Sequence, residues 1–311
     1  MKKTYLLPLV TMTATVLNLV SCSQKDTPLT DKVAVKFSSG IITMTPASRA
    51  AGMTWNANDA IGVYMLEAGS KVVVDGMANK EYVATTGGVT GKFEANGDII
   101  YFPDNGKQVR FMSYYPYDDN MTESNVYKVN ISNQDPQAEI DLLYSFNEEI
   151  LFEKTTVTNK TVPLVFKHKL TKVYIKVKAG EGLENDDLDD IEVHFSGLNT
   201  QANFDLMTGE LKSPSVNDVD ITPVRIADEG DHVACYEAII LPMADPIGEI
   251  VFDLNNGVGE NESDVFTWAF DKELKSSVKY LYNVTINRSG LIVEATIVDW
   301  TEVDTEDISA E

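Results

Sequence analysis

Cys22 is the residue whose type and position could undergo covalent chemistry. It follows an apolar run that Lys2 and Lys3 precede, and small or aliphatic side chains (Leu19-Val20-Ser21) stand directly before it. This arrangement is typical of a signal peptide that is removed at a cysteine carrying diacylglycerol on its sulfur. Acyl chains bind bilayers with about 0.8 kcal/mol per buried CH₂ group, so two or three of them give durable anchoring. We predict a type II (lipoprotein) signal peptide over residues 1–21 and a lipidated Cys22, the alternative being an ordinary signal peptide with a chance cysteine.

The other reactive side chains form no recognisable catalytic or metal-binding pattern. His168, His194 and His232 fall in no H-x-x-x-H or C-x-x-C arrangement, so no zinc site is indicated. The acidic run 184–190 lacks the residue order of a specific calcium loop, so we expect a solvated loop there and leave calcium binding open. Nucleophile-elbow and phosphate-loop patterns are absent, although the abundant carboxylates leave glycoside hydrolysis open. We expect no catalytic residue, no metal, no cofactor and no enzyme.

Cys235 is the second of the two cysteines and lies in the apolar run VACYEAIILP. Once Cys22 carries lipid, no intramolecular disulfide can form, so stability must come from packed cores. No histidine or cationic side chain lies within two residues of Cys235 in sequence. The pattern therefore predicts a buried, inert thiol rather than a nucleophile.

The chain is strongly acidic, with 48 Asp and Glu against 25 Lys and Arg and a formal net charge of −23. Removal of the signal peptide also removes Lys2 and Lys3 and makes the charge more negative. Phosphate groups of nucleic acids and anionic lipids would be repelled by this charge. We therefore expect no nucleic-acid partner and a soluble, non-adhering surface.

Short alternating apolar runs, separated by Gly, Pro, Asn and Asp, follow one another from Lys32 onward. In TKVYIKVK, the residues Val173, Ile175 and Val177 share one face, and Lys172, Tyr174, Lys176 and Lys178 share the other, which is the period of a half-buried strand. Runs of this length and spacing are typical of β-sandwiches, and we predict an all-β fold. The runs are KVAVKFSS, IGVYML, KVVVDG, DIIYFP, QVRFMSYYPY, VPLVFKHKL, TKVYIKVKAG, DIEVHFSGL, EAIILP, EIVFDLN, DVFTWAF, LYNVTI and LIVEATIVDW.

The length of the mature chain exceeds one compact domain and predicts two. A polar stretch at 152–160 (FEKTTVTNK) marks the expected boundary. We therefore predict a lipidated tether over 22–32, an N-terminal β-sandwich over 33–158, a C-terminal β-sandwich over 159–300 and an acidic tail over 301–311.

The aromatic motif FMSYYPY (111–117) has two interpretations. Tyr114, Tyr115 and Tyr117 could line a sugar-binding face. Alternation instead places Phe111 and Tyr115 on one side of a strand and Tyr114 on the other, so at least one set should fill a core. We favour the core.

Seven phrases stand in one order over nearly the whole mature chain: TWNANDAIGVYM (54–65), RFMSYYPYDD (110–119), DLLYS (141–145), VPLVFKHKLTKVYIKV (162–177), NTQANFDLMTGEL (199–211), AIILP (238–242) and YLYNVTINRSGLIVEATIVDW (280–300). Together with the lipobox before them, they resemble the fimbrillin family of Bacteroides-type bacteria, the subunits of protease-matured pili. The resemblance implies two tandem transthyretin-like (Greek-key) β-sandwich domains. It also implies a pilus subunit or a related surface adhesin.

The resemblance further implies export as an outer-membrane lipoprotein, held on the cell surface through Cys22, and removal of the first strand by an Arg-specific protease before incorporation into a fimbrium. By this resemblance Lys32–Thr45 (KVAVKFSSGIITMT) would be that strand, with Val33, Val35 and Phe37 alternating. Arg49 then matches the cleavage position, so that the mature subunit would start at Ala50, whereas the alternative is an ordinary surface arginine.

Loss of this strand would uncover a groove that accepts a strand from another pilin subunit, by β-strand addition. Each large apolar side chain is worth roughly 1.5–3 kcal/mol when buried, so four or five would be worth on the order of 10 kcal/mol. The route requires that the strand complete a sheet and yet be replaceable. A strand lying loose outside, or locked between two others beyond withdrawal, would exclude it.

The segment after Trp300 is acidic and does not alternate, so it makes a poor donor strand. Either GLIVEATIVDW is the donor, or the subunit accepts a strand without donating one, and we favour a tip or accessory adhesin that contacts a host or bacterial surface receptor. The alternatives are a surface glycan-binding lipoprotein and a permanently lipidated pilus anchor.

Overall fold

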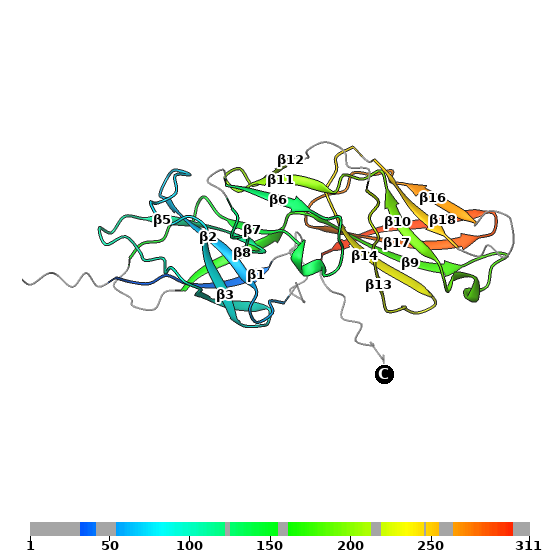
Figure 1. Ribbon diagram of the computed structural model, residues 1–311, viewed down its shortest axis with the longest axis horizontal. Helices are drawn as coiled ribbons and strands as arrows, with labels where there is room; N and C mark the ends of the chain where they lie inside the picture. Colours follow the sequence, from blue (N-terminus) through cyan, green and yellow to red (C-terminus); the bar gives the residue numbers. More distant parts are fainter. Residues whose placement is uncertain are drawn as a thin grey trace, which may run out of the picture. The chain divides into compact units, whose positions relative to one another are not determined.

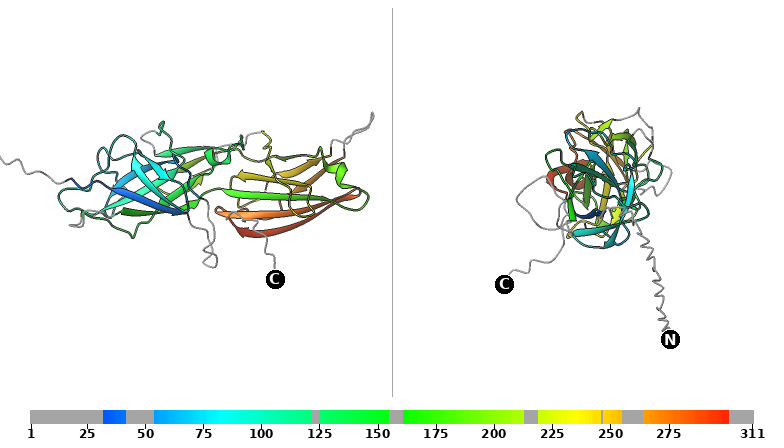
Figure 2. Two further views of the ribbon diagram at one scale, coloured as in Figure 1. Left: turned by 90° about the horizontal axis from the view of Figure 1, so that it is seen from below. Right: turned by 90° about the vertical axis from the view of Figure 1, so that its left-hand side faces the viewer.

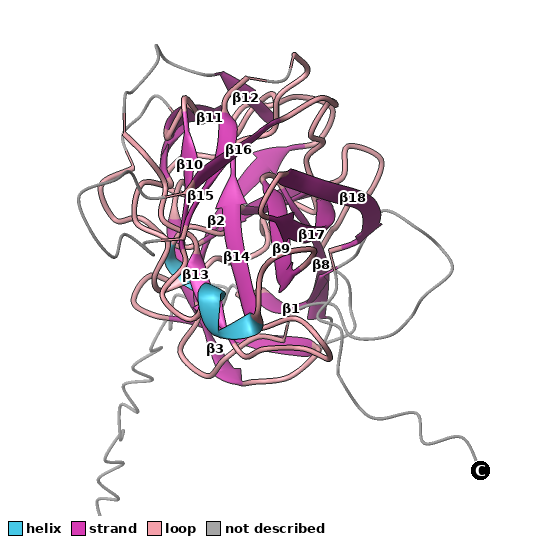
Figure 3. Ribbon diagram, turned by 90° about the vertical axis from the view of Figure 1, so that its right-hand side faces the viewer, coloured by secondary structure: helices cyan, strands magenta, loops and turns pink. Residues whose placement is uncertain are grey.

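The computed structural model describes residues 32–41, 54–121, 125–154, 161–212, 219–245, 247–254 and 264–300. Within these ranges the chain forms strands and no α-helix (Figure 3). The helical turns there are the 3₁₀ helices η1 (Gln137–Glu139) and η2 (Asn185–Leu188). The predicted all-β class is confirmed. No helix in the described part of the chain is long and apolar enough to cross a membrane.

Seven strands of the described chain close into a barrel in the order β1-β4-β3-β2-β5-β7-β8 (Figure 1). Their neighbours are antiparallel except for β1 and β8, which run parallel. A parallel pair requires a long connection, so the barrel closes only after the chain has passed from residue 41 to residue 161. The strands are β1 (Lys36–Ile41), β2 (Ala60–Glu67), β3 (Lys80–Thr86), β4 (Thr90–Ala95), β5 (Val109–Tyr115), β7 (Leu143–Phe146) and β8 (Thr161–His168).

The other described strands form three sheets, in the orders β13-β14-β9-β17-β18, β10-β15-β16 and β12-β11-β6. They are β6 (Val126–Asn130), β9 (Thr171–Ala179), β10 (Glu192–Ser196), β11 (Gln201–Asp205), β12 (Glu210–Lys212), β13 (Val224–Ile226), β14 (Ala234–Ile240), β15 (Glu249–Asp253), β16 (Val265–Ala269), β17 (Val278–Asn287) and β18 (Gly290–Asp299). β18 lies at the edge of its sheet and is drawn in red in Figure 2.

The boundary expected between residues 158 and 159 does not coincide with the limit of the barrel. β8 begins beyond it, at Thr161, and pairs with β1 and β7, so the barrel continues to His168. β6 pairs in turn with β11, from the later half of the chain. A polar connecting segment separates strands within one sheet as readily as it separates domains, so the change of composition does not mark the end of the barrel. The division into two tandem transthyretin-like sandwiches stays a prediction.

β9 shows how the alternating pattern produces a two-faced strand. Val173, Ile175 and Val177 are fully buried, as predicted, because every second side chain of a strand points to the same side. Tyr174, on the opposite face, is also only 5% exposed, because Lys279 Nζ lies over its ring at 4.3 Å and its hydroxyl donates to Glu229. Long neighbouring side chains therefore cover a face that the sequence pattern assigns to solvent.

The described residues form two hydrophobic cores. One fills the barrel and includes Phe37 and Trp55. The other lies among the remaining sheets and also takes in Tyr64 and Tyr114, from the outer faces of β2 and β5. The ring of Tyr114 lies 5.4 Å from that of Tyr127 on β6, measured between centroids. β2 and β5 are consequently buried on both faces.

Candidate functional site

The candidate site is the groove of the barrel that holds β1. On one side β1 pairs antiparallel with β4, with Phe37 opposite Phe93 and Ser39 opposite Gly91. On the other side it pairs in parallel with β8 from Thr161 to Phe166. The strand therefore completes the barrel between two neighbours rather than at a free edge (Figures 1 and 2).

Pairing continues into the residues that precede β1. The backbone N–H of Val35 donates to the carbonyl of Ile100 over 2.9 Å, and the N–H of Phe102 donates to the carbonyl of Val33 over 3.0 Å. Backbone groups in a barrel wall need such partners, because an unpaired buried N–H or C=O costs free energy. Removing residues 33–41 would leave two rows of backbone groups unpaired, one on each side of the groove.

Alternate side chains of this segment point into the barrel. Val35, Phe37 and Ser39 are at most 2% exposed, whereas Lys36 is exposed. The alternation predicted at Val33, Val35 and Phe37 is confirmed, with Val33 half-buried against the core. The floor of the groove therefore contacts every second side chain of the strand that lies in it.

Phe37 packs β1 against the opposite wall of the barrel. Its ring meets those of Tyr82 and Phe111 edge to face, at centroid distances of 4.8 and 5.1 Å. Such pairs contribute about 0.5–1.5 kcal/mol beyond the burial of their area. The hydroxyl of Tyr82 in turn accepts the N–H of Ile100 over 3.0 Å. One side chain of β1 thus contacts β3 and β5, and Tyr82 links it to the segment beside the strand.

On its other side β8 pairs with β7 only through Lys167 and His168, and the residues before them are poorly suited to bind an added strand. Val165 points its N–H toward β7, where it donates to the hydroxyl of Ser145 over 3.0 Å. Pro163 is two residues earlier, so its nitrogen faces the same way and carries no hydrogen to donate. A hollow of about 210 Å³ lies here between β7 and β8. An added strand would find a poorer partner in this seam than in the groove of β1.

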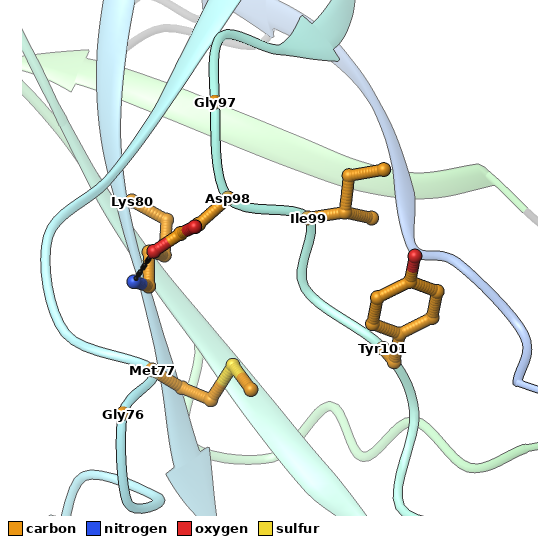
Figure 4. Close-up of a pocket in the computed structure, with 7 residues that line it drawn as sticks. All are labelled: Gly76, Met77, Lys80, Gly97, Asp98, Ile99 and Tyr101. Carbon is orange, nitrogen blue, oxygen red and sulfur yellow. Dashed lines mark hydrogen bonds and ion pairs between the residues drawn. The ribbon is translucent and has the colours of Figure 1, made fainter.

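A second hollow, of about 370 Å³, lies where the chain enters the groove (Figure 4). Lys80 and Asp98, which form an ion pair of 2.6 Å, line one side of it, and Tyr101 lines the other. The hydrogen bond and charge of Lys80 lower the pKa of the Asp98 carboxyl. Lys32 Nζ lies over the ring of Tyr101 at 5.5 Å, and Ala34 forms a bridge with the same residue. This hollow therefore shares Tyr101 with the first segment of the described chain.

Comparison with known proteins agrees with this architecture. The sequence profile described as fimbrillin-like matches residues 48–300. The chain belongs to the fimbrillin-like family. It is 36% identical over 299 residues to a Bacteroides uniformis protein described as a fimbrium subunit, Fim1C, covering 93% of this chain and 92% of that one.

Solved structures of similar proteins share the fold of this fimbrillin-like chain. One, described as a cell-adhesion protein of Bacteroides uniformis, is 31% identical, with a TM-score of 0.70 over 88% of this chain and all of that one. Another, from Bacteroides ovatus, has a TM-score of 0.65 at 22% identity over 87% of this chain and 99% of that one, and shows the fold alone. These relatives carry the names of fimbrial and adhesion proteins, not of enzymes.

The residues that sequence reasoning assigned to processing lie outside the described ranges. They are Cys22, Arg49 and Ala50, together with the end of the expected first strand beyond Ile41. Lipidation and cleavage of this fimbrillin-like chain therefore stay predictions.

The aromatic residues proposed for glycan contact divide between core and surface. Tyr114 and Tyr115 are buried, which removes both from ligand contact in this fold. The alternation pattern did not reveal that both tyrosines are buried, because the barrel covers one face of β5 and the sheet of β6 covers the other. Tyr117 remains half-exposed at a hollow of about 600 Å³ lined also by Glu81, Asp118, Asp119 and Glu139. This acidic lining matches no specific glycan pattern.

Hydrogen bonds from side chains of the acidic loop 184–190 to its own backbone hold the loop in a defined conformation. η2 begins with a capping box in which the Glu184 and Asp187 side chains each bond the other residue's backbone N–H. Leu188 is fully buried beneath it. No group of His, Cys, Asp or Glu that could hold a metal ion occurs among the described residues.

A buried Asp–His pair is the polar feature that sequence reasoning missed. Asp141 Oδ1 lies 2.9 Å from His168 Nδ1, and both side chains are 1% exposed. Trp300 stacks on the imidazole at a centroid distance of 4.0 Å. The hydroxyl of Ser277 donates to the carbonyl of His168 and not to its ring, so Ser277 is not aligned with the pair as a nucleophile. The arrangement joins the end of β8 to the residue that follows β18, and its burial excludes a substrate.

Cys235 is fully buried in β14, as predicted, and burial raises the pKa of its thiol. A protonated thiol without access to solvent is a poor nucleophile.

We expect a maleimide to leave Cys235 unmodified in a folded chain that begins at Ser23 and to label it after unfolding, as read by intact mass. Ala68→Cys, in the exposed turn after β2, is the control that should label at once. Equally fast labelling of Cys235 would show that β14 opens in the native protein.

Proposed function

We propose that this protein is a structural subunit of a bacterial surface fimbrium and that the groove of β1 accepts a strand from another subunit. The observation that carries the proposal is the position of β1 between β4 and β8, with its alternate side chains in the barrel core. A strand held on both sides leaves, when it departs, a groove with two edges of unpaired backbone and an apolar floor. Such a groove is a directional acceptor for β-strand addition.

The free energy that holds β1 is compatible with exchange. The described part of the first segment, residues 32–41, includes two large apolar side chains that are fully buried, Val35 and Phe37, rather than four or five. At roughly 1.5–3 kcal/mol each, they contribute about 3–6 kcal/mol. A foreign strand with similar side chains would recover this amount and the backbone hydrogen bonds as well.

The central position of β1 does not by itself prevent its withdrawal. β1 is the first strand of the described chain, so no strand within the described ranges precedes it and holds its leading end. A single cut between residues 42 and 53 would free its trailing end as well. The strand could then leave along the groove without the chain being threaded through a loop, which meets the condition set from the sequence.

Arg49 is the proposed cleavage site, and Ala50 would then become the first residue of the mature subunit. A cut there would separate β1 and the lipid on Cys22 from the remainder of the barrel. One proteolytic event would thus release the subunit from the outer membrane and open its groove. Head-to-tail repetition of the resulting contact does not close on itself and produces a filament.

β18 is the proposed donor strand. It pairs only with β17 among the described strands, over ten residue pairs, and lies at the edge of its sheet. Ile292 and Ile297 are 56% and 65% exposed, so part of the strand contributes little to its own core. These features favour a subunit that donates as well as accepts a strand. The tip or accessory role, which was based on the acidic segment 301–311 outside the described ranges, stays a prediction.

The proposal is tested by treating the precursor from Ser23 onward with an Arg-specific protease. We expect a new N-terminus at Ala50 by mass spectrometry, followed by polymers on size-exclusion chromatography. Arg49→Lys keeps the charge and should abolish both results, whereas Arg288→Lys, at the exposed turn between β17 and β18, should leave both unchanged. A cleaved chain that remains monomeric and takes up no other fimbrial subunit would refute strand exchange.

If the protein is instead a permanent pilus anchor, we expect that the chain is not cut at Arg49 in the cell. A permanently lipidated anchor would keep Cys22 and Arg49 in one chain, so N-terminal mass spectrometry of the membrane-bound protein separates the two roles. The glycan-binding alternative retains only Tyr117 of its three aromatic residues, and no further observation favours it.

A further inference from the structure

The groove holds residues 35–41, which are Val35 and β1, and the third inward position of this segment differs from the two before it. Val35 and Phe37 are large and apolar, whereas Ser39 is small and 2% exposed. The residue opposite Ser39 on β4 is Gly91, which is also small and buried. Two small residues therefore face each other across the pair, at a point where the barrel core would ordinarily be filled by larger side chains.

Trp55 lies beneath Gly91, the residue opposite Ser39. Its ring lies 5.0 Å from that of Phe93, beside Phe37, and 5.2 Å from that of Phe166, beside Ile41. A methyl group added to Gly91 would stand 2.9 Å from Trp55 Cδ1 and 2.6 Å from Phe93. The indole thus spans the floor of the groove from the second inward position to the fourth and leaves room for a small side chain at the third.

The outward positions of β1 impose no comparable restriction. Lys36 is exposed, and Ser38 and Gly40 are half-exposed. A methyl group added to Gly40 would meet no atom within 4 Å. The groove can therefore discriminate between strands only through the inward row, at positions 35, 37, 39 and 41.

We propose that this groove selects its incoming strand by the sizes of four inward residues, in the order large, large, small, large, and that Trp55 enforces the small third residue. This inference rests on the proposed strand exchange and adds the register and direction in which a strand can enter. The order is not symmetric, so a reversed strand, or one shifted by two residues, places a large side chain against Trp55. A side chain that is too large for its place in a packed core forces strained rotamers and backbone shifts.

The donor strand proposed above contains this order. Leu291, Val293, Ala295 and Ile297 form one face of β18, with the small residue third. The other face carries Glu294 and cannot fill an apolar floor. Aligned with Val35, Phe37, Ser39 and Ile41, this segment of a second copy would run in the direction of β1, parallel to β8. The partner is thus a second copy of this chain, in one register.

The size rule can be tested in the uncut chain, where neither cleavage nor assembly is required. Ser39→Leu is expected to lower the thermal unfolding midpoint by about 3–10 °C through overpacking against Trp55. Ser39→Ala is the matched control and should leave the midpoint unchanged or raise it, because Ser39 Oγ has no hydrogen-bond partner among the described residues. A Ser39→Leu chain as stable as the Ser39→Ala chain would overturn the rule.

A strand transplant tests the complete order. Residues 35–41 (VKFSSGI) are replaced by LIVEATI from β18 in one chain and by LIAEVTI in another, which has the same composition but the small residue second. The first chain should unfold below the wild type, because valine fills less of the Phe37 site. The second should unfold about 5–10 °C lower still, with faster amide hydrogen exchange in β4 and β8. Equal midpoints and equal exchange in the two chains would refute the size order.

A synthetic peptide assay then links the rule to assembly. The chain processed at Arg49 should bind a peptide containing LIVEATI at least about tenfold more tightly than one containing LIAEVTI, a ratio that corresponds to about 1.4 kcal/mol. Binding of both peptides with equal affinity would overturn the rule and leave strand exchange standing. If neither peptide binds while the uncut variants follow the size order, strand exchange fails and the rule holds only for β1 itself.

Discussion

Alanine in place of Phe37 is expected to lower the free energy of unfolding by about 3–5 kcal/mol, as for other fully buried aromatic residues. Phe37 is 1% exposed and loses its edge-to-face contacts with Tyr82 and Phe111. The cavity would open at the junction of β1 with β3 and β5, where few side chains can move to fill it. Urea-induced unfolding of the uncut chain, followed by circular dichroism, measures the change.

Lys36→Ala is the control for this substitution, because Lys36 precedes Phe37 on the same strand and points to solvent. It should change the free energy of unfolding by no more than about 0.5 kcal/mol. If Phe37→Ala costs as little as Lys36→Ala, then β1 adds little to the barrel. An empty groove would then be a weak acceptor, and the case for strand exchange would lose its energetic basis.

The second large effect is expected at the buried pair of Asp141 and His168. Asp141→Ala should lower the free energy of unfolding by about 3–5 kcal/mol, because it leaves the partner of a buried pair uncompensated. Both side chains are 1% exposed, and the second carboxylate oxygen and His168 Nε2 have no partner among the described residues. Water therefore cannot readily replace the lost contact, and Trp300 would lose the ordered ring on which it stacks. Denaturant unfolding, followed by circular dichroism, provides the measurement.

Two further variants distinguish loss of the pair from a general loss of packing. Asp141→Leu combined with His168→Leu removes both polar groups and should recover part of the stability lost in Asp141→Ala. Asp231→Ala breaks the exposed ion pair with Lys178 and should leave stability unchanged within error. An Asp141→Ala chain as stable as the Asp231→Ala chain would mean that the pair contributes nothing to the junction of β8 and Trp300.

Local patterns in the sequence predict single strands well and their partners poorly. The alternation at Val173, Ile175 and Val177, and at Val35 and Phe37, is a property of neighbouring residues, so the buried faces could be assigned without a structure. Period two does not reveal how many faces are covered. Tyr114 and Tyr115 lie on opposite faces of β5, and both are buried because a second sheet covers the outside of the barrel.

The candidate site depends on contacts between distant parts of the chain. That residues 33–41 form a strand with an apolar face follows from the sequence. That this strand lies between β4 and β8 does not, because its parallel partner begins at Thr161 and no local signal specifies such a pairing. The same holds for Trp55, whose position beneath Gly91 depends on its packing against Phe93 and Phe166.

The sequence by itself determined the all-β class, the faces of its clearest strands, the inert setting of Cys235 and, through seven ordered phrases, the family. Only the tertiary structure decided which strands flank β1, that the barrel extends to His168, and that Asp141, His168 and Trp300 meet. The physical reason is the distance along the chain over which each interaction acts. Backbone geometry and side-chain alternation act over a few residues, whereas strand partners and buried polar pairs are selected by the packing of the whole chain.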